Sequence, residues 1–387
     1  MPTVNVPQPE FMDDEEIAIF ADAVGKFYQD KAPEKRVLKW REDGQVEREF
    51  WNEAGEAGLL GVSVPEEYGG HGGDFRHEMV VIDQQAKHGV EGFAASLHNT
   101  VILPYLVRHG TEEQKKKYLP KLVTGELVSA IAMTEPGVGS DLQGITTTAL
   151  KDGNGYRING AKTYISNGQT ADFIIVVAKT DPKERAKGIS LMLLETEGAE
   201  GFQRGKKLDK VGMDAADTSE LFFDDVFVPS DAVLGGEEGK GFYQLMGELP
   251  QERLIIAMGA MTGIEKALEV TMEFVKERKA FGQTIWDFQN TQFVLAELNA
   301  RATAARVFVN HCIAQHLEGK LDVPTACMAK LMVTELQGEV VDKCLQFHGG
   351  AGFINDYPIA RMYRDCRITR IFGGSNEVMK MVIARSM

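Results

Sequence analysis

The sequence predicts an α+β protein of three consecutive domains: a helical domain over residues 1–127, a β domain over residues 128–240 and a second helical domain over residues 241–387. Two observations lead to this fold class. Apolar residues recur every three or four positions in the first and last parts of the chain, which is the period of an amphipathic helix. Between them lie short runs of Ile, Val, Phe and Tyr separated by Gly, Asp and Pro, as expected for strands and turns.

The first helical domain is expected to begin near Asp13 and Asp14, because aspartate is a good N-cap residue. The apolar stripe that follows consists of Ile17, Phe20, Val24 and Phe27. The glycine-rich segment 68–74 cannot continue a helix, since glycine is unfavourable in helix interiors. We therefore expect a loop there, in which His71 is solvated rather than catalytic.

The β domain is predicted from four runs at residues 155–168, 171–180, 188–197 and 220–229, with a turn at 152–155. The helices that follow carry two long apolar stripes, and we expect them to pack into a bundle with further chains. These stripes consist of Leu254, Met258, Met261, Leu268, Met272 and Val275, and of Val294, Leu298, Ala305 and Val309.

Composition excludes several classes of protein. The 387-residue chain has 42 basic and 57 acidic side chains and a formal net charge of −15, so no nucleic-acid partner is expected. No apolar run approaches the ~20 residues of a membrane span, and the acidic N-terminal segment is unlike a signal peptide, which makes the cytoplasm the expected location. The four cysteines lack C-x-x-C spacing and are expected to be reduced core residues, so no metal site is predicted.

Common cofactor and catalytic motifs are also missing. G-x-G-x-x-G, the P-loop, H-E-x-x-H and G-x-S-x-G do not occur, which weakens Rossmann, P-loop, zincin and α/β-hydrolase interpretations. The segment 133–142 instead presents backbone N–H groups and hydroxyls in one turn, an arrangement suited to bind an anionic or polar part of a cofactor. A capped domain junction explains the same pattern equally well.

Five collinear motifs carry a more specific signal. They lie at residues 133–142, 164–168, 278–282, 346–352 and 372–377, and together they resemble the acyl-CoA dehydrogenase family from about Phe11 to the C-terminus. The resemblance implies an N-terminal helical domain, a middle β-barrel-like domain and a C-terminal four-helix bundle. It also implies a homotetramer with one FAD in each subunit.

By this resemblance, FAD lies along the junction of the first two domains and along parts of the C-terminal domain. Arg278 would neutralise the FAD pyrophosphate from a neighbouring subunit, and Ser166 would lie near flavin N5. The implied FAD-binding residues are Ile131, Met133, Thr134, Gly139, Ser140, Tyr164, Ser166, Arg278, Phe281, Phe288, Gln289, Gln346, Gly349, Gly350, Ser375 and Glu377.

The resemblance also requires a base for the α-proton of a thioester. Much of the family has a glutamate where this chain has Gly373, so either activity is lost or the base has moved. The segment 247–257 resembles the long-chain and isovaleryl subgroup, which identifies Glu252 as the base. Pro250 is expected in the first turn of a helix, so that the helix dipole would favour an ionised Glu252, while burial by the acyl chain would raise its pKa.

Four residues are expected to contact the substrate. By the resemblance, Arg253 would contact the CoA pantetheine or orient Glu252, and the Gly373 N–H would bind the thioester oxygen, on which negative charge develops. The resemblance adds Ser140 and Gly374. The length of the acyl chain stays open, since Phe93 and Ala94 would either line the acyl crevice or pack between helices.

The implied activity is the FAD-dependent α,β-dehydrogenation of a fatty acyl-CoA to trans-2-enoyl-CoA, as in fatty acid β-oxidation. Glu252 would take the α-proton, a hydride would pass to flavin N5, and an electron-transferring flavoprotein would accept the electrons. Three alternatives stay open: an isovaleryl- or short-branched-chain dehydrogenase, a non-catalytic acyl-CoA-binding relative, and an acyl-CoA oxidase.

Overall fold

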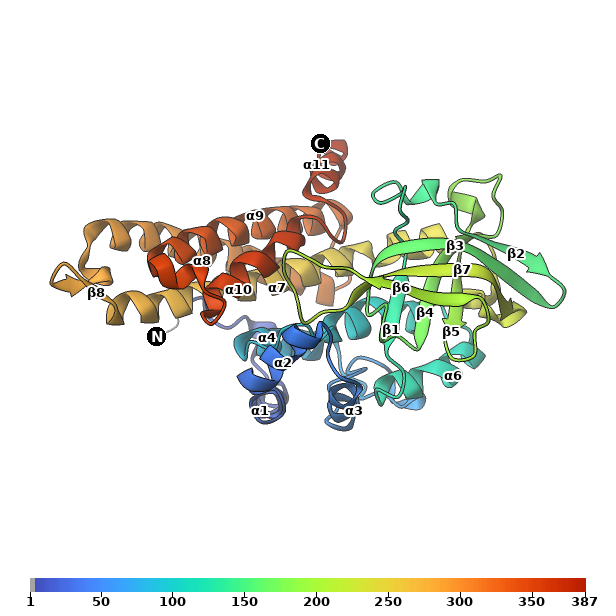
Figure 1. The fold of residues 1–387 in the computed structure, drawn as a ribbon, viewed down its shortest axis with the longest axis horizontal. Coiled ribbons are helices and arrows are strands. Elements are labelled where there is room, and N and C mark those ends of the chain that lie inside the picture. The colour runs from blue at the N-terminus through green and yellow to red at the C-terminus, as the bar shows by residue number, and fades with distance from the viewer. Residues whose placement is uncertain (1–3) are drawn as a thin grey trace.

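The computed structural model describes residues 4–387 and begins with a helical domain (Figure 1). Asp14 caps the first helix by accepting a hydrogen bond from the Glu16 N–H at 3.0 Å, which confirms the predicted N-cap. The glycine-rich segment after Tyr68 is a loop, and His71 is exposed, as predicted. The helices are α1 (Glu15–Lys31), α2 (Glu34–Asp43), α3 (Arg48–Glu56), α4 (Phe75–Lys87), a π-helix at Leu97–Ile102, α5 (Leu103–His109) and α6 (Glu112–Val123).

The middle of the chain forms one curled, seven-stranded sheet. Its strands are β1 (Ser129–Ala132), β2 (Thr148–Asp152), β3 (Gly155–Ser166), β4 (Phe173–Lys179), β5 (Ile189–Glu195), β6 (Phe202–Lys207) and β7 (Thr218–Pro229). Strand β4 pairs with β1 and β5, strand β3 lies between β2 and β7, and the pair Thr148–Lys179 joins the two halves. The four predicted runs correspond to β3, β4, β5 and β7. Strands β1, β2 and β6 were not among them, because β1 has only four residues and the others expose polar side chains.

The last part of the chain is again helical. Its helices are α7 (Gly241–Glu277), α8 (Gln289–Leu317), α9 (Val323–His348), α10 (Pro358–Asp365) and α11 (Asn376–Ser386), and a hairpin of β8 (Lys279–Ala280) and β9 (Gln283–Thr284) joins α7 to α8. Both predicted apolar stripes face the interior of this bundle: Leu254, Met261 and Leu298 are buried, and Met272 and Val294 are partly buried.

An ion-pair cluster joins the three parts of the chain. Arg41 of α2 contacts Glu91 from the first domain, Asp214 at 2.8 Å from the loop before β7, and Asp365 at 2.9 Å from the end of α10. Its guanidinium is buried, so these pairs are more strongly coupled than ion pairs in water. The cluster therefore fixes how the sheet and the C-terminal helices sit on the first domain.

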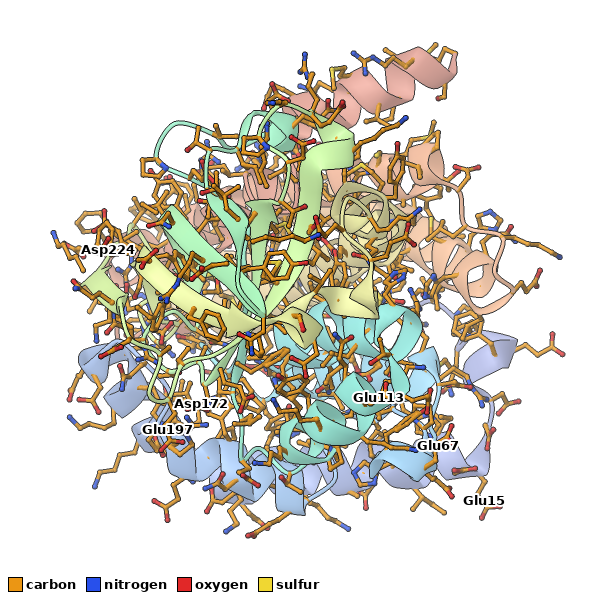
Figure 2. All side chains as sticks on the ribbon, turned by 90° about the vertical axis from the view of Figure 1, so that its right-hand side faces the viewer. Glu15, Glu67, Glu113, Asp172, Glu197 and Asp224 are labelled. Carbon is orange, nitrogen blue, oxygen red and sulfur yellow. The ribbon has the colours of Figure 1, made fainter. Side chains whose placement is uncertain are left out.

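The arrangement is elongated, with the sheet at one end of α7 and the β8–β9 hairpin at the other (Figure 1). Much of the negative charge faces outward: Figure 2 labels exposed acidic side chains on several different elements, among them Glu15, Glu67, Glu113, Glu197 and Asp224. Across residues 4–387, no helix is long and apolar enough to cross a membrane.

Candidate active site

The turn after β1 forms an open cradle beside strand β3. The Thr163 N–H donates to the Thr134 carbonyl at 2.9 Å, and the Lys162 ammonium donates to the Met133 carbonyl at the same distance. At Gly139, as at Gly137, an added Cβ would meet no atom within 4 Å. The predicted FAD contacts from Met133 to Ser140 therefore lie on a turn that is hydrogen-bonded to β3 on one side and open on the other, and Ile131 lies just before it in β1.

A buried ion pair holds this cradle in place. Lys162 of β3 and Glu135 of the turn are both buried, and their Nζ and Oε1 atoms are 2.9 Å apart. Glu135 also accepts hydrogen bonds from the Thr146 N–H and hydroxyl and from the Thr147 N–H. Burial works to raise the pKa of Glu135, but the Lys162 ammonium and these donors outweigh it and lower the pKa to about 2. Burial lowers the pKa of Lys162 to about 8.

Tyr164 and Ser166 lie on the open side of β3. Tyr164 has a φ of 60°, in the left-handed region, and its side chain is 68% exposed. The register between β3 and β7 shifts between Lys162 and Ile165, which accommodates this residue. A left-handed backbone conformation is energetically costly for a bulky residue, and such strained residues are often found at functional sites. The exposed aromatic ring of Tyr164 is also suited to stack against a flat cofactor.

The predicted base Glu252 lies on α7 and is 8% exposed. The Tyr105 hydroxyl of α5 donates to Glu252 Oε1 at 2.8 Å. Burial raises the pKa of Glu252 to about 7, the Tyr105 hydrogen bond and Arg253 oppose that shift, and Glu248 adds to it. A carboxyl group with this pKa is suited to accept and release a proton near neutral pH.

The expected position of Pro250 is wrong. Helix α7 begins at Gly241, so Pro250 lies in its interior and Glu252 is not at the positive end of the helix dipole. The extra turns are anchored by Glu248, a buried carboxylate that contacts Arg108 and lies 3.0 Å from His109 Nε2. These tertiary contacts outweigh the helix-breaking tendency of proline, and burial rather than the dipole governs the pKa of Glu252.

Arg253 points away from the surface. It is buried, and its Nη1 donates to the Cys327 sulfur of α9 at 3.2 Å. Its Nε has no acceptor among residues 4–387. This geometry places Arg253 beside Glu252 between α7 and α9, which favours a role near the base over the expected contact with the CoA pantetheine.

The loop before α11 approaches the same region of α7. Gly373 and Gly374 have φ values of 62° and 87°, and an added Cβ at Gly373 would lie 2.2 Å from Ile256 Cδ1, one turn along the helix from Glu252. Buried Lys330 of α9 donates to the Gly374 carbonyl at 3.0 Å and to Asn376 Oδ1 at 2.8 Å. Glycine fits this strained, crowded position, whereas a glutamate would have to displace Ile256.

The two remaining predicted residues of this loop flank the start of α11. Ser375 caps the helix by accepting from the Val378 N–H, and Glu377 is exposed in its first turn. The structure therefore brings Glu252, Arg253 and the loop 373–377 to one segment of α7.

A second group of predicted residues lies at the opposite end of the bundle. Arg278 is 26 residues from Glu252, which corresponds to about 39 Å along a helix. The end of α9 lies beside the end of α7, since the rings of Phe274 and His348 stack with centroids 4.2 Å apart. The exposed or partly exposed predicted residues that follow α7 or lie at the end of α9 are Arg278, Phe281, Phe288, Gln289, Gln346, Gly349 and Gly350. The residues near Glu252 and those near Arg278 are therefore too far apart in one chain to contact the same part of one FAD.

Phe93 does not line a crevice near Glu252. It is buried in the first domain, with its ring centroid 4.8 Å from those of Phe50 and Trp51. Sequence reasoning also missed Tyr105, Lys162 and Lys330. A tyrosine in an apolar helix and a lysine among strand or helix residues give no local signal of the partner that each finds elsewhere in the chain.

Comparison with known proteins agrees with this geometry. Models of the acyl-CoA dehydrogenase N-terminal, middle and C-terminal domains match residues 14–126, 130–226 and 239–387. The chain is 47% identical to the long-chain specific acyl-CoA dehydrogenase of Sus scrofa and 37% identical to the isovaleryl-CoA dehydrogenase of Oryza sativa. Each alignment covers 95% of this chain, with 86% and 90% of the respective relative.

Solved structures give the same answer. An acyl-CoA dehydrogenase from Geobacillus kaustophilus superposes with a TM-score of 0.94 at 47% identity, over 96% of this chain and 98% of that one. A chain of the electron-transferring flavoprotein structure of Acidaminococcus fermentans superposes with a TM-score of 0.91 at 36% identity, over 98% and 99% of the two chains. This chain therefore belongs to the acyl-CoA dehydrogenase family of FAD-binding oxidoreductases.

Proposed function

We propose that this protein converts a fatty acyl-CoA to the trans-2-enoyl-CoA, with Glu252 as the base. The observation that carries this proposal is a buried carboxylate whose pKa is raised to about 7, on the helix face that the Gly373 loop approaches. Two bonds break on the thioester: the α-proton goes to Glu252, and the β-hydrogen leaves as a hydride. Bound FAD supplies the hydride acceptor.

The protein's own groups would act at three points. Glu252 takes the proton, and the loop around Gly373 binds the thioester oxygen. The Gly373 N–H has no acceptor among residues 4–387 and is therefore free to donate to that oxygen as negative charge develops on it. Ser140 and Gly374 would complete the substrate contacts. The bound acyl chain would exclude water from the base.

We further propose that FAD binds between two copies of the chain within a homotetramer. The cradle at 131–140, with Tyr164, Ser166, Ser375 and Glu377, would contact the flavin of one copy, and the residues around Arg278 and Gly349 would contact the remainder from another. Two large apolar side chains near this second group are 96% and 88% exposed, Phe281 and Phe353. Such residues are typical of surfaces buried on association.

The oligomer can be tested without turnover. Phe353→Glu should shift the purified protein to a smaller species in sedimentation velocity and lower its flavin content, since a charge would then have to be buried at the interface. A variant that stays fully assembled and fully loaded with FAD would place Phe353 outside the interface.

For the substrate, we propose the long-chain class, with an electron-transferring flavoprotein as acceptor and residues 1–127, 128–240 and 241–387 as the three domains. The identity to the long-chain relative exceeds that to the isovaleryl relative by ten percentage points, 47% against 37%. Both relatives are described as mitochondrial, so the cytoplasmic location stays a prediction from the sequence.

An anaerobic titration of the holoenzyme with acyl-CoA thioesters tests this function. Palmitoyl-CoA should bleach the oxidised flavin at lower concentration than isovaleryl-CoA. Stronger bleaching by isovaleryl-CoA would favour the branched-chain alternative, and an unchanged spectrum with every thioester would favour a binding protein. Peroxide formation in air would indicate an oxidase.

A further inference from the structure

We propose that Tyr105 is the positioning residue of the base: its hydroxyl holds one oxygen of Glu252 and leaves the other oxygen to accept the α-proton. This inference rests on the proposed role of Glu252. It adds to the site a residue of the first domain, 147 positions earlier in the chain.

The contact is direct and buried. The Tyr105 hydroxyl lies 2.8 Å from Glu252 Oε1, and the tyrosine ring is inaccessible to solvent. Among residues 4–387, no group donates a hydrogen bond to Glu252 Oε2. A hydrogen bond to an ionised acceptor is stronger than one between neutral groups, so this single donor orients the carboxylate.

Helix α5 is a fixed platform for the hydroxyl. Tyr105, Arg108 and His109 are spaced i, i+3 and i+4, so they share one helix face, and all three contact acids of α7. The π-helix directly before α5 is held by Asn99, which donates to the Leu59 carbonyl at 2.8 Å and accepts from the Gly61 N–H at 3.1 Å. These contacts fix the backbone of the segment that carries the hydroxyl.

The groups around Glu252 determine whether loss of the Tyr105 hydroxyl raises or lowers the pKa of Glu252. Glu248 and Arg253 act on Glu252 from α7 itself, and Tyr105 acts from α5. Glu248 in turn contacts Arg108 and His109 of α5 and interacts electrostatically with His316 of α8. Burial and Glu248 raise the pKa of Glu252, whereas Tyr105 and Arg253 lower it, so removal of the hydroxyl should raise that pKa further.

The test is Tyr105→Phe in the holoenzyme, which removes the hydroxyl and keeps the ring. A hydrogen bond to a charged group corresponds to a shift of about one to two pH units, so the acid limb of kcat/KM should move up by that amount. With the limb starting near pH 7, the rate at pH 7 should fall about 5- to 50-fold. KM should stay within about twofold of the wild type, because substrate binding is untouched, whereas the rate at high pH should fall by the share that orientation of the carboxylate contributes.

A matched control is Tyr68→Phe. Tyr68 is also buried and donates to a carboxylate, Glu112 Oε2 at 2.9 Å, but in another part of the first domain, so its variant should keep the wild-type pH profile. An unshifted acid limb in Tyr105→Phe would overturn the proposal. So would a rise in KM that accounts for the whole loss of kcat/KM at every pH, because it would indicate damage to substrate binding rather than to the base.

A second readout does not need turnover. The protonation of Glu252 can be followed by its infrared carboxyl band, assigned by the loss of that band in Glu252→Gln. Tyr105→Phe should move the titration to higher pH. An unmoved titration would overturn the role of Tyr105, even in an active enzyme, whereas normal turnover by Glu252→Gln would refute the base and leave the Tyr105 contact standing.

Discussion

Replacement of Lys162 by methionine should loosen the FAD cradle. The change removes the buried ammonium that lies 2.9 Å from both Glu135 Oε1 and the Met133 carbonyl oxygen. Removing one partner of a buried ion pair typically costs about 3–5 kcal/mol, because the other charge stays buried without compensation. Glu135 keeps its donors from Thr146 and Thr147, so we expect about 3 kcal/mol, the lower end of that range.

If this free energy is lost from the FAD-binding conformation of the cradle, FAD affinity should drop about a hundredfold, since about 1.4 kcal/mol corresponds to a factor of ten. The assay is equilibrium dialysis of FAD against reconstituted apoprotein. The double variant Lys162→Met/Glu135→Gln should recover most of the affinity, because it removes both charges. Wild-type affinity in the single variant, or no recovery in the double variant, would refute the reasoning.

The ion pair between Lys162 and Glu135 should also make FAD binding depend on pH. The pKa of Glu135 is lowered from 4.5 to about 2, so its contribution to stability is complete above about pH 4.5 and disappears as the pH falls toward 2. FAD release from the wild type should therefore increase through this acid window. The double variant should show a smaller change over the same range, because it lacks the titrating group.

Two further predictions concern other parts of the site. Gly373→Ala should slow flavin reduction severalfold at unchanged FAD content, since alanine is strained at a φ of 62° and its methyl meets Ile256; Ile256→Ala should partly restore the single-turnover rate. Arg278→Ala should release FAD during gel filtration without a change in the far-ultraviolet circular dichroism, because Arg278 is exposed and does not pack in the core. Tight FAD binding by this variant would exclude a phosphate contact.

Local patterns predicted the order of the domains well, because hydrophobic period is a property of neighbouring residues. The stripe around Leu254 and Met261 is buried, and the runs that became β3 and β4 pair as strands. Short or polar strands such as β6 gave little signal, since their pairing depends on β7 rather than on their own composition.

The electrostatics of the site could not be predicted from neighbouring residues. Pro250 suggested a helix start, but contacts of Glu248 with α5 extend α7 back to Gly241. Tyr105 and Lys330 find their partners across domains or helices, and no spacing in the sequence marks such pairs. Phe93 gave an ambiguous signal because an apolar residue suits a crevice and a core equally, and here it packs in the core.

The central claim is that Glu252 removes the α-proton. The most direct test is the rate of anaerobic flavin reduction by saturating palmitoyl-CoA in Glu252→Gln, which keeps the shape of the side chain and the Tyr105 contact but cannot take up a proton in the same way. The variant should bind the thioester with nearly unchanged affinity and reduce its flavin at least about a hundredfold more slowly, the lower bound for a positioned base. Reduction at the wild-type rate would show that another group is the base.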